Sequence, residues 1–198
     1  MRTLEEAALE ASTCPRCRLA RGRTQVVYGV GNPDADLMFI GEAPGYHEDK
    51  QGEPFVGAAG QLLNRLLAEI EIPREDVYIS NVVLCRPPGN RDPLPDEIEA
   101  CRPWLTERIE IVDPAVIVTL GNWATRNILD RPVSISRVRG QRFAWQGRTV
   151  IPTFHPAAIL HGGGESSNQM TALRADFQEI KAALAERPAP VEEQLGLF

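Results

Sequence analysis

The 198-residue chain lacks an apolar run long enough to cross a bilayer, for which a helix needs about 20 residues. Its first six residues already include two acids and no apolar segment, so no signal peptide is expected. Aromatic residues make up only 6% of the chain, and there are three histidines and four cysteines. These scarcities exclude a membrane span, predict a cytoplasmic location, and draw attention to each histidine and cysteine.

A surplus of positive charge is also missing. The chain has 21 lysines and arginines against 27 acids, which gives a net charge of −6 at pH 7. This balance argues against a protein that binds nucleic acid over its whole surface. However, residues 131–148 contain five arginines and no acid, so a local basic face is possible.

Several motifs of common enzyme classes are absent. There is no Walker glycine-lysine pattern and no defensible serine, histidine and acid order, so phosphoryl and acyl transfer are not indicated. Gly29 and Gly31 form only a weak phosphate signature, because no helix and no third glycine follow them. No internal repeat is found.

What the chain does contain is an alternation of short apolar runs with amphipathic stretches. Buried strands are predicted at 37–40, 77–83, 115–120 and 150–154, and helices at 3–11, 58–70, 96–112, 121–129 and 169–185. A further short strand is expected at 26–28, a hairpin at 142–151 and a loop at 46–57. Such alternation predicts an α/β fold, a three-layer αβα sandwich around a mainly parallel four-stranded sheet.

The domain organisation follows from the same pattern. Residues 1–185 are expected to form a single domain and a monomer, and residues 186–198 a flexible tail. The tail begins with a proline-rich stretch that is typical of an extended linker. It ends with the apolar peptide 194–198.

Polar residues follow three of the predicted strands. Glu42, Asn81 and His155 stand at strand exits, and Phe55 and Asn90 lie in neighbouring loops. In open α/β sheets, ligands bind at the carboxyl ends of the strands. A phenyl ring can stack on a flat heterocycle, an amide can bind its edge, and an imidazole can stabilise an oxygen that gains charge. The pattern therefore indicates a site for a flat polar heterocycle.

The four cysteines suggest a metal site. Cys14 and Cys17 are separated by two residues, a spacing at which one turn can supply two ligands, and Cys85 and Cys101 follow. Disulfides are uncommon in a cytosolic chain, which raises the expectation of metal binding. The spacing alone leaves zinc and an iron–sulfur cluster about equally favoured.

Five separated segments together resemble one known family. They are Gly41-Glu42-Ala43-Pro44-Gly45, Pro54-Phe55-Val56-Gly57, Asn81, the run 85–91 and His155-Pro156-Ala157. In this order they resemble the family-four, iron–sulfur uracil-DNA glycosylases, over about residues 1–185. The resemblance implies a 4Fe-4S cluster on Cys14, Cys17, Cys85 and Cys101. It also implies an enzyme that flips deoxyuridine out of DNA and hydrolyses the N-glycosidic bond, starting base excision repair.

The resemblance assigns roles to individual residues. Asn81 would bind the uracil edge and reject cytosine, Phe55 would stack on the base, and His155 would stabilise charge on a uracil oxygen. Gly41, Glu42 and the Ala43 backbone would position uracil. Glu48 and Asn90 would orient the attacking water, and the division of roles between Glu42 and Glu48 is left open.

Two positions depart from related glycosylases. Ala43 supplies no aspartate that could act as a base, and Tyr46 replaces an acid found in many relatives. Tyr46 either walls the pocket or packs within its loop. The arginine-rich insert with a histidine, found in relatives that trap uracil DNA covalently, is absent after Cys85.

DNA and partner contacts are further expectations. Arg137, Arg139 and Arg142 are candidate phosphate contacts, and Ile159 or Leu160 could wedge into the base stack. His47 and His161 are expected to be solvated. The peptide Gln194-Leu195-Gly196-Leu197-Phe198 is similar to the peptides by which bacterial repair proteins dock on the sliding clamp.

Two other functions fit parts of the pattern. One is a non-turnover or covalently trapping uracil-DNA-binding protein. The other is an iron–sulfur electron carrier or nucleotide-binding module, which would leave Phe55, Asn81 and His155 without a shared purpose.

Overall fold

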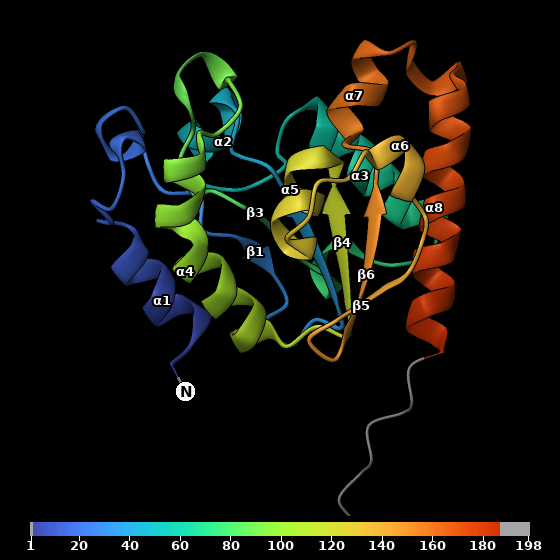
Figure 1. The fold of residues 1–198 in the computed structure, drawn as a ribbon, viewed down its shortest axis with the longest axis horizontal. Coiled ribbons are helices and arrows are strands. Elements are labelled where there is room, and N and C mark those ends of the chain that lie inside the picture. The colour runs from blue at the N-terminus through green and yellow to red at the C-terminus, as the bar shows by residue number, and fades with distance from the viewer. Residues whose placement is uncertain (1, 187–198) are drawn as a thin grey trace, which may run out of the picture.

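The computed structural model describes residues 2–186 and has a central sheet with helices on both faces (Figure 1). The strand order is β1-β3-β2-β4-β6-β5. Four neighbouring strands run parallel, namely β3 (Tyr78–Asn81), β2 (Leu37–Gly41), β4 (Val116–Leu120) and β6 (Arg148–Thr153). The predicted four-stranded parallel core is therefore confirmed.

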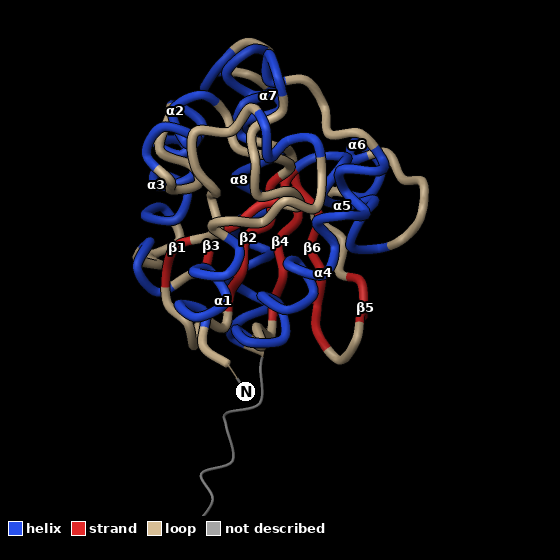
Figure 2. Tube along the Cα trace, turned by 90° about the vertical axis from the view of Figure 1, so that its left-hand side faces the viewer, coloured by secondary structure: helices blue, strands red, loops and turns tan. Residues whose placement is uncertain are grey.

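Two short strands border this core and pair antiparallel to it, as the tube in Figure 2 shows at either side of the sheet. They are β1 (Val30–Gly31) and β5 (Phe143–Trp145). β5 and β6 form the hairpin predicted at 142–151, whereas β1 begins two residues after the strand expected at 26–28. That expectation was wrong because Val27 is buried and donates its N–H to the Leu84 carbonyl at 2.8 Å without joining a ladder.

Alternate residues of each parallel strand pack against opposite helical layers, as the two-residue repeat of a strand requires. On one face, Met38 and Ile40 pack with α1, α4 and α5, and on the other, Leu37 and Phe39 pack with α3, α7 and α8. This arrangement confirms the predicted three-layer sandwich. The first layer comprises α1 (Leu4–Ala11), α4 (Pro95–Val112) and α5 (Gly121–Leu129), and the second comprises α3 (Ala58–Glu69), α7 (Pro156–His161) and α8 (Asn168–Ala185).

The remaining helical elements are short. They are α2 (Tyr46–Gln51), α6 (Ile135–Val138) and the 3₁₀ turns Arg18–Arg21, Arg74–Asp76, Pro88–Asn90 and Gly164–Ser166. The loop expected at 46–57 was thus partly wrong, because α2 has no apolar stripe to reveal it. Two features of the sequence mark this helix, namely the acids of its first turn and the glycine at its end. In the structure, Gly52 forms the C-cap with φ of 78°.

No helix among residues 2–186 is long and apolar enough to cross a membrane.

The packing of α8 on the sheet offers a test of the core. Phe177 stacks on Phe39 with 5.9 Å between ring centroids and is 1% exposed. We expect Phe177→Ala to lower the free energy of unfolding by about 3–5 kcal/mol, because it leaves a cavity under the sheet. Leu9→Ala is the control, since Leu9 is 75% exposed and its loss should change stability by less than about 0.5 kcal/mol. Equal midpoints for both variants in urea denaturation would contradict this account of the core.

Candidate active site

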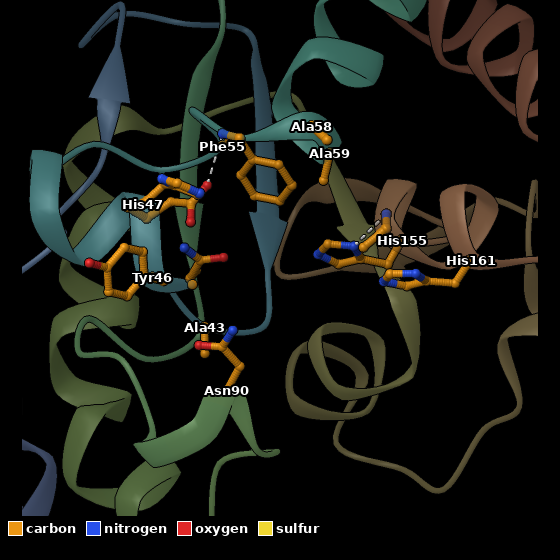
Figure 3. A pocket seen from close by; sticks show the side chains of 14 residues that line it. Ala43, Tyr46, His47, Phe55, Ala58, Ala59, Asn90, His155 and His161 are labelled. Atoms are coloured by element: carbon orange, nitrogen blue, oxygen red, sulfur yellow. Dashed lines mark hydrogen bonds between the residues drawn. The ribbon is translucent and has the colours of Figure 1, made fainter. Parts of the chain in front are cut away.

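A cavity of about 460 Å³ opens where β2, β3 and β6 end. Ala43 follows β2, Asn81 ends β3 and His155 follows β6, so three parallel strands each bring one wall residue. Figure 3 shows Tyr46 and His47 on one side, His155 and His161 on the other, and Phe55 between them. The cavity therefore lies at the sheet edge at which the sequence predicted a site.

Glu48, on α2, shapes the cavity wall through backbone hydrogen bonds. Its Oε1 accepts N–H groups from Val56 at 3.1 Å and Gly57 at 3.2 Å. Gly57 is the N-cap of α3, so the carboxylate sits at the positive end of that helix, where a negative charge is stabilised. Glu48 thus fixes the segment that carries Phe55.

Phe55 lies in a strained conformation with φ of 55°, which a residue with a side chain adopts only when its surroundings enforce it. Gly60 leaves room for this conformation on one side, because a Cβ at position 60 would collide with the Phe55 carbonyl. Gly41 allows the ring to approach from the other, because a Cβ there would lie 2.8 Å from the ring.

Asn81 is 3% exposed and lies opposite Gly41 in the β2–β3 register. A Cβ at position 41 would also collide with the Asn81 Oδ1. The glycine therefore makes room for both the amide and the phenyl ring. This contact brings together three residues that the resemblance assigns to the base.

His155 caps α7, and its Nδ1 accepts the Ala157 N–H at 3.1 Å (Figure 3). That bond places the ring proton of the neutral imidazole on Nε2, which is then a donor. Burial lowers the pKa of His155 to about 4, although the charge of Glu48 opposes the shift. The ring also stacks on Phe55 with 5.5 Å between centroids. His155 is therefore a neutral hydrogen-bond donor at neutral pH.

Glu42 does not face the cavity. Its carboxyl group interacts with Asp92, and burial together with that second carboxylate raises the pKa of Glu42 to about 7. The cavity is lined instead by Ala43 and Glu48. Because Glu42 is not among the lining residues and its carboxyl group interacts with Asp92, a role for its side chain at the base stays a prediction.

Asn90 borders the cavity from the loop after β3 and has φ of 55°. Its Oδ1 accepts the Arg86 Nε–H at 2.6 Å, and the Arg86 guanidinium lies 5.1 Å from the Tyr46 ring centroid. Because its oxygen is engaged, the Asn90 amide has its NH₂ group left to offer to a ligand. Tyr46 is half-exposed and walls the pocket, which settles the alternative left open by the sequence.

The residues predicted to contact DNA differ in their exposure and in their salt bridges. Ile159 is 0% exposed in the core under α7, so its prediction as a wedge was wrong, whereas Leu160 is 37% exposed. Arg139 forms a salt bridge with the buried Asp176, donating from Nε at 3.0 Å, and is thereby held against α8 and not directed to solvent. Arg137 is exposed on α6, and Arg142 pairs with Glu179 and Glu186.

His47 and His161 were the residues that sequence reasoning undervalued. Both are exposed as predicted, yet both border the cavity. His47 is adjacent to Glu48, and His161 ends the helix that His155 begins, so their neighbours in sequence were the available signal.

The four cysteines are free thiols that pack in or against one apolar cluster. Three of them accept hydrogen bonds from N–H donors: Cys14 from the Trp104 indole at 3.3 Å, Cys101 from the Leu84 backbone at 3.4 Å, and Cys85 from Arg23 at 3.6 Å. Donors of this kind stabilise sulfur that carries negative charge. Burial raises the pKa of the Cys85 thiol to about 11, although the hydrogen bond from Arg23 opposes the shift.

Among residues 2–186, no three or more His, Cys, Asp or Glu side chains are grouped so that they could hold one metal ion. A tetrahedral zinc site requires all its thiolates within about 2.3 Å of one point. A 4Fe-4S cluster makes no such demand, because each cysteine binds a different iron atom. The N–H donors directed at three of the sulfurs are of the kind that stabilises thiolates bound to a metal centre.

Comparisons with known proteins agree with this geometry. The family model described as "Uracil DNA glycosylase superfamily" matches residues 28–178. A Type-4 uracil-DNA glycosylase of Thermotoga maritima is 51% identical over 181 residues, which cover 90% of this chain and 93% of the relative. Similar proteins with the same description occur in Sulfurisphaera tokodaii (45% identical; 91% and 84% covered) and Saccharolobus solfataricus (44%; 98% and 93%).

The chain belongs to the uracil-DNA glycosylase superfamily. Within it, the chain is similar over most of its length to proteins described as type 4, in agreement with the resemblance found in its sequence.

The state of His155 can be measured directly. We expect NMR of the imidazole nitrogens to show a neutral ring protonated on Nε2 down to about pH 4. Glu48→Gln should lower this pKa further, because it removes the negative charge that opposes the effect of burial. A His155 that titrates near its ordinary value of 6.5 would refute this account.

The lowered pKa of His155 also predicts how the free energy of unfolding depends on pH. Between pH 6.5 and about 4 the unfolded chain binds the proton and the folded chain does not, so the free energy of unfolding falls as the pH falls through this window. The His155→Gln variant should lose this part of the pH dependence.

Proposed function

We propose that the chain is a uracil-DNA glycosylase that flips a deoxyuridine out of DNA and hydrolyses its N-glycosidic bond, which starts base excision repair. The observation that carries the proposal is the convergence of Asn81, Phe55 and His155 on one cavity. The printed names of its relatives, Type-4 uracil-DNA glycosylase, support the same reaction.

Asn81 reads the edge of the flipped base. Uracil presents an N–H donor at N3 beside the O4 acceptor, and the Asn81 amide offers the complementary acceptor and donor. Cytosine presents an acceptor at N3 beside an amino donor, so the same amide would face like groups. Phe55 stacks on the ring face; Glu48 holds its segment through the Val56 N–H, and Gly60 leaves room for its backbone.

His155 acts on the charge that develops when the glycosidic bond breaks. The electron pair of that bond passes to uracil, and a carbonyl oxygen of the base becomes more negative. The neutral imidazole donates from Nε2 to that oxygen, since Nδ1 is already bonded to Ala157. A donor fixed before the reaction loses no energy to reorientation as the charge appears.

Glu48 takes the water-directing role that the sequence left open between Glu42 and Glu48. It lines the cavity, whereas Glu42 does not, and its Oε1 is engaged by Val56 and Gly57, which leaves Oε2 for a water molecule. Its negative charge also favours an oxocarbenium-like sugar. The Asn90 NH₂ and the backbone at Ala43 complete the positioning of water and base.

Cys14, Cys17, Cys85 and Cys101 would hold a 4Fe-4S cluster. The cluster supplies cross-links between the N-terminal segment, the loop after β3 and α4, and no step of bond cleavage depends on it. Because bond cleavage does not use these cysteines, their proposed role is structural.

DNA approaches the open side of the cavity. Leu160, one residue before His161 on α7, fills the gap left by the flipped base, and Arg137 contacts a phosphate. The clamp-binding peptide 194–198 lies outside the described residues and stays a prediction, as do the monomeric state and the cytoplasmic location.

Substitution of the two central side chains tests the proposal. We expect Asn81→Ala to lower uracil release from DNA at least about tenfold, and His155→Ala by about 100-fold or more, because each removes a polar contact made to the reacting base. The measurement is kcat/KM on uracil-containing DNA, with circular dichroism to verify folding.

Gln178→Ala is the matched control, because Gln178 is an exposed amide on α8 and does not line the cavity. Full activity in both site variants would overturn the assignment. Alkali treatment after incubation with uracil DNA distinguishes the two functions. An enzyme that turns over leaves many alkali-labile abasic sites per protein molecule, whereas a protein that traps uracil DNA does not.

The cofactor has a test of its own. We expect protein purified without oxygen to carry about four iron atoms and four sulfides per chain and to be brown. Cys17→Ala should lower the iron content and the thermal stability, whereas Arg21→Ala, in the exposed turn that follows Cys17, should leave the iron content unchanged. One zinc ion per colourless chain would contradict the cluster.

A further inference from the structure

Arg108 is the largest side chain that is fully buried in the described chain. Its guanidinium donates to the carbonyls of Tyr28 at 2.8 Å, Trp104 at 3.0 Å and Asn81 at 3.1 Å, and also to the Ser80 hydroxyl. All of these acceptors are uncharged oxygens. A buried cation is costly unless negative charge lies nearby, so its surroundings require an account.

The groups whose charge acts on Arg108 are Tyr78, Cys101, Tyr28 and Glu107. Glu107 is already paired with Arg2. Burial raises the pKa of both tyrosines, to about 12 for Tyr28, so they are neutral at physiological pH. Cys101 is the fourth of these groups, and it lies on the same helix as Arg108.

Helix α4 places Arg108 between the cysteines and the base pocket. Cys101, Trp104 and Arg108 follow at intervals of three and four residues, so they share the buried face of the helix. Trp104 donates to Cys14, and Cys101 accepts the Leu84 N–H, while Arg108 reaches Ser80 and Asn81 two turns further along.

The strand segment is therefore held at both ends by the same helix. Residues 80–84 run from the hydroxyl and carbonyl bound by Arg108 to the Leu84 N–H bound by Cys101. Asn81, which reads the base in the proposed function, lies inside this segment. A displacement of about 1 Å at such a residue can cost about 100-fold in rate.

We propose that Arg108 is a positioning residue that couples the cysteine site to base recognition: its helix holds Leu84 through Cys101, while its own Nη2 holds the Asn81 carbonyl. This inference rests on the proposed function and on the cluster at the four cysteines. It predicts that loss of the guanidinium changes both the cluster and the reading of uracil.

The test uses Arg108→Met, which keeps an unbranched apolar stem, and Arg108→Lys, which keeps the charge but not the planar fork. Arg102→Met is the control, because Arg102 is exposed on the same helix and pairs with Glu99. Each full-length protein, loaded with its cluster, is assayed for reduction potential by voltammetry, kcat/KM on uracil DNA, and affinity for DNA with an abasic site.

For Arg108→Met we expect a negative shift of the reduction potential, because the reduced cluster loses a stabilising positive charge. We expect kcat/KM on uracil DNA to fall at least about tenfold, whereas affinity for abasic DNA, which has no base for Asn81 to read, should change by less than about twofold. Arg108→Lys should keep the potential near that of the parent and still lose uracil activity. Arg102→Met should match the parent in all three.

An unchanged potential and unchanged uracil activity in folded Arg108→Met would overturn the inference, as would equal losses on uracil and abasic DNA. If the methionine variant does not fold, Arg108→Lys decides, and full uracil activity in it refutes the coupling. Absence of uracil release by the parent protein would refute the proposed function instead, and iron-free active parent protein would refute the cluster.

Discussion

The parallel register between β2 and β3 is the constraint on which the site depends. It places Gly41 opposite Asn81, and the pairing continues past both strands through the Val82 and Val83 N–H groups, which bond to the carbonyls of Gly41 and Glu42 at 2.9 and 3.2 Å. Because side chains alternate along a strand, a slip of one residue would turn the Asn81 amide away from the cavity. The glycine, the amide and the phenyl ring that fills the space above Gly41 are therefore specified together.

Two carboxylates near the end of β2 acquire different properties from their surroundings. Glu48 accepts hydrogen bonds from two backbone N–H groups at the start of α3. Glu42 faces Asp92 in a partly buried position, where burial and the second carboxylate favour a proton. Of the two, only Glu48 lines the cavity, and the proposed function therefore gives it the water-directing role.

Much of the fold could be predicted from the sequence, because buried parallel strands are continuous apolar runs and their covering helices carry apolar stripes. Asn81 and His155 were found for the same reason, since each directly follows such a run. The direction of Glu42, the burial of Ile159 and the pairing of Arg139 with Asp176 could not be predicted, because each depends on a tertiary neighbour. Arg108 was missed because an arginine on a polar-looking helix is usually exposed, and nothing local signals its burial.

The short border strands have a consequence for the molecule in solution. A long unpaired strand at the edge of a sheet can pair with the edge of another molecule and start aggregation. In the described part of the chain, β1 is two residues long and β5 three, and Gly31, with φ of 128°, turns the backbone of β1 out of the usual strand conformation. Such short edges offer few backbone groups for pairing with another molecule. The protein is therefore expected to resist aggregation through its sheet edges at high concentration.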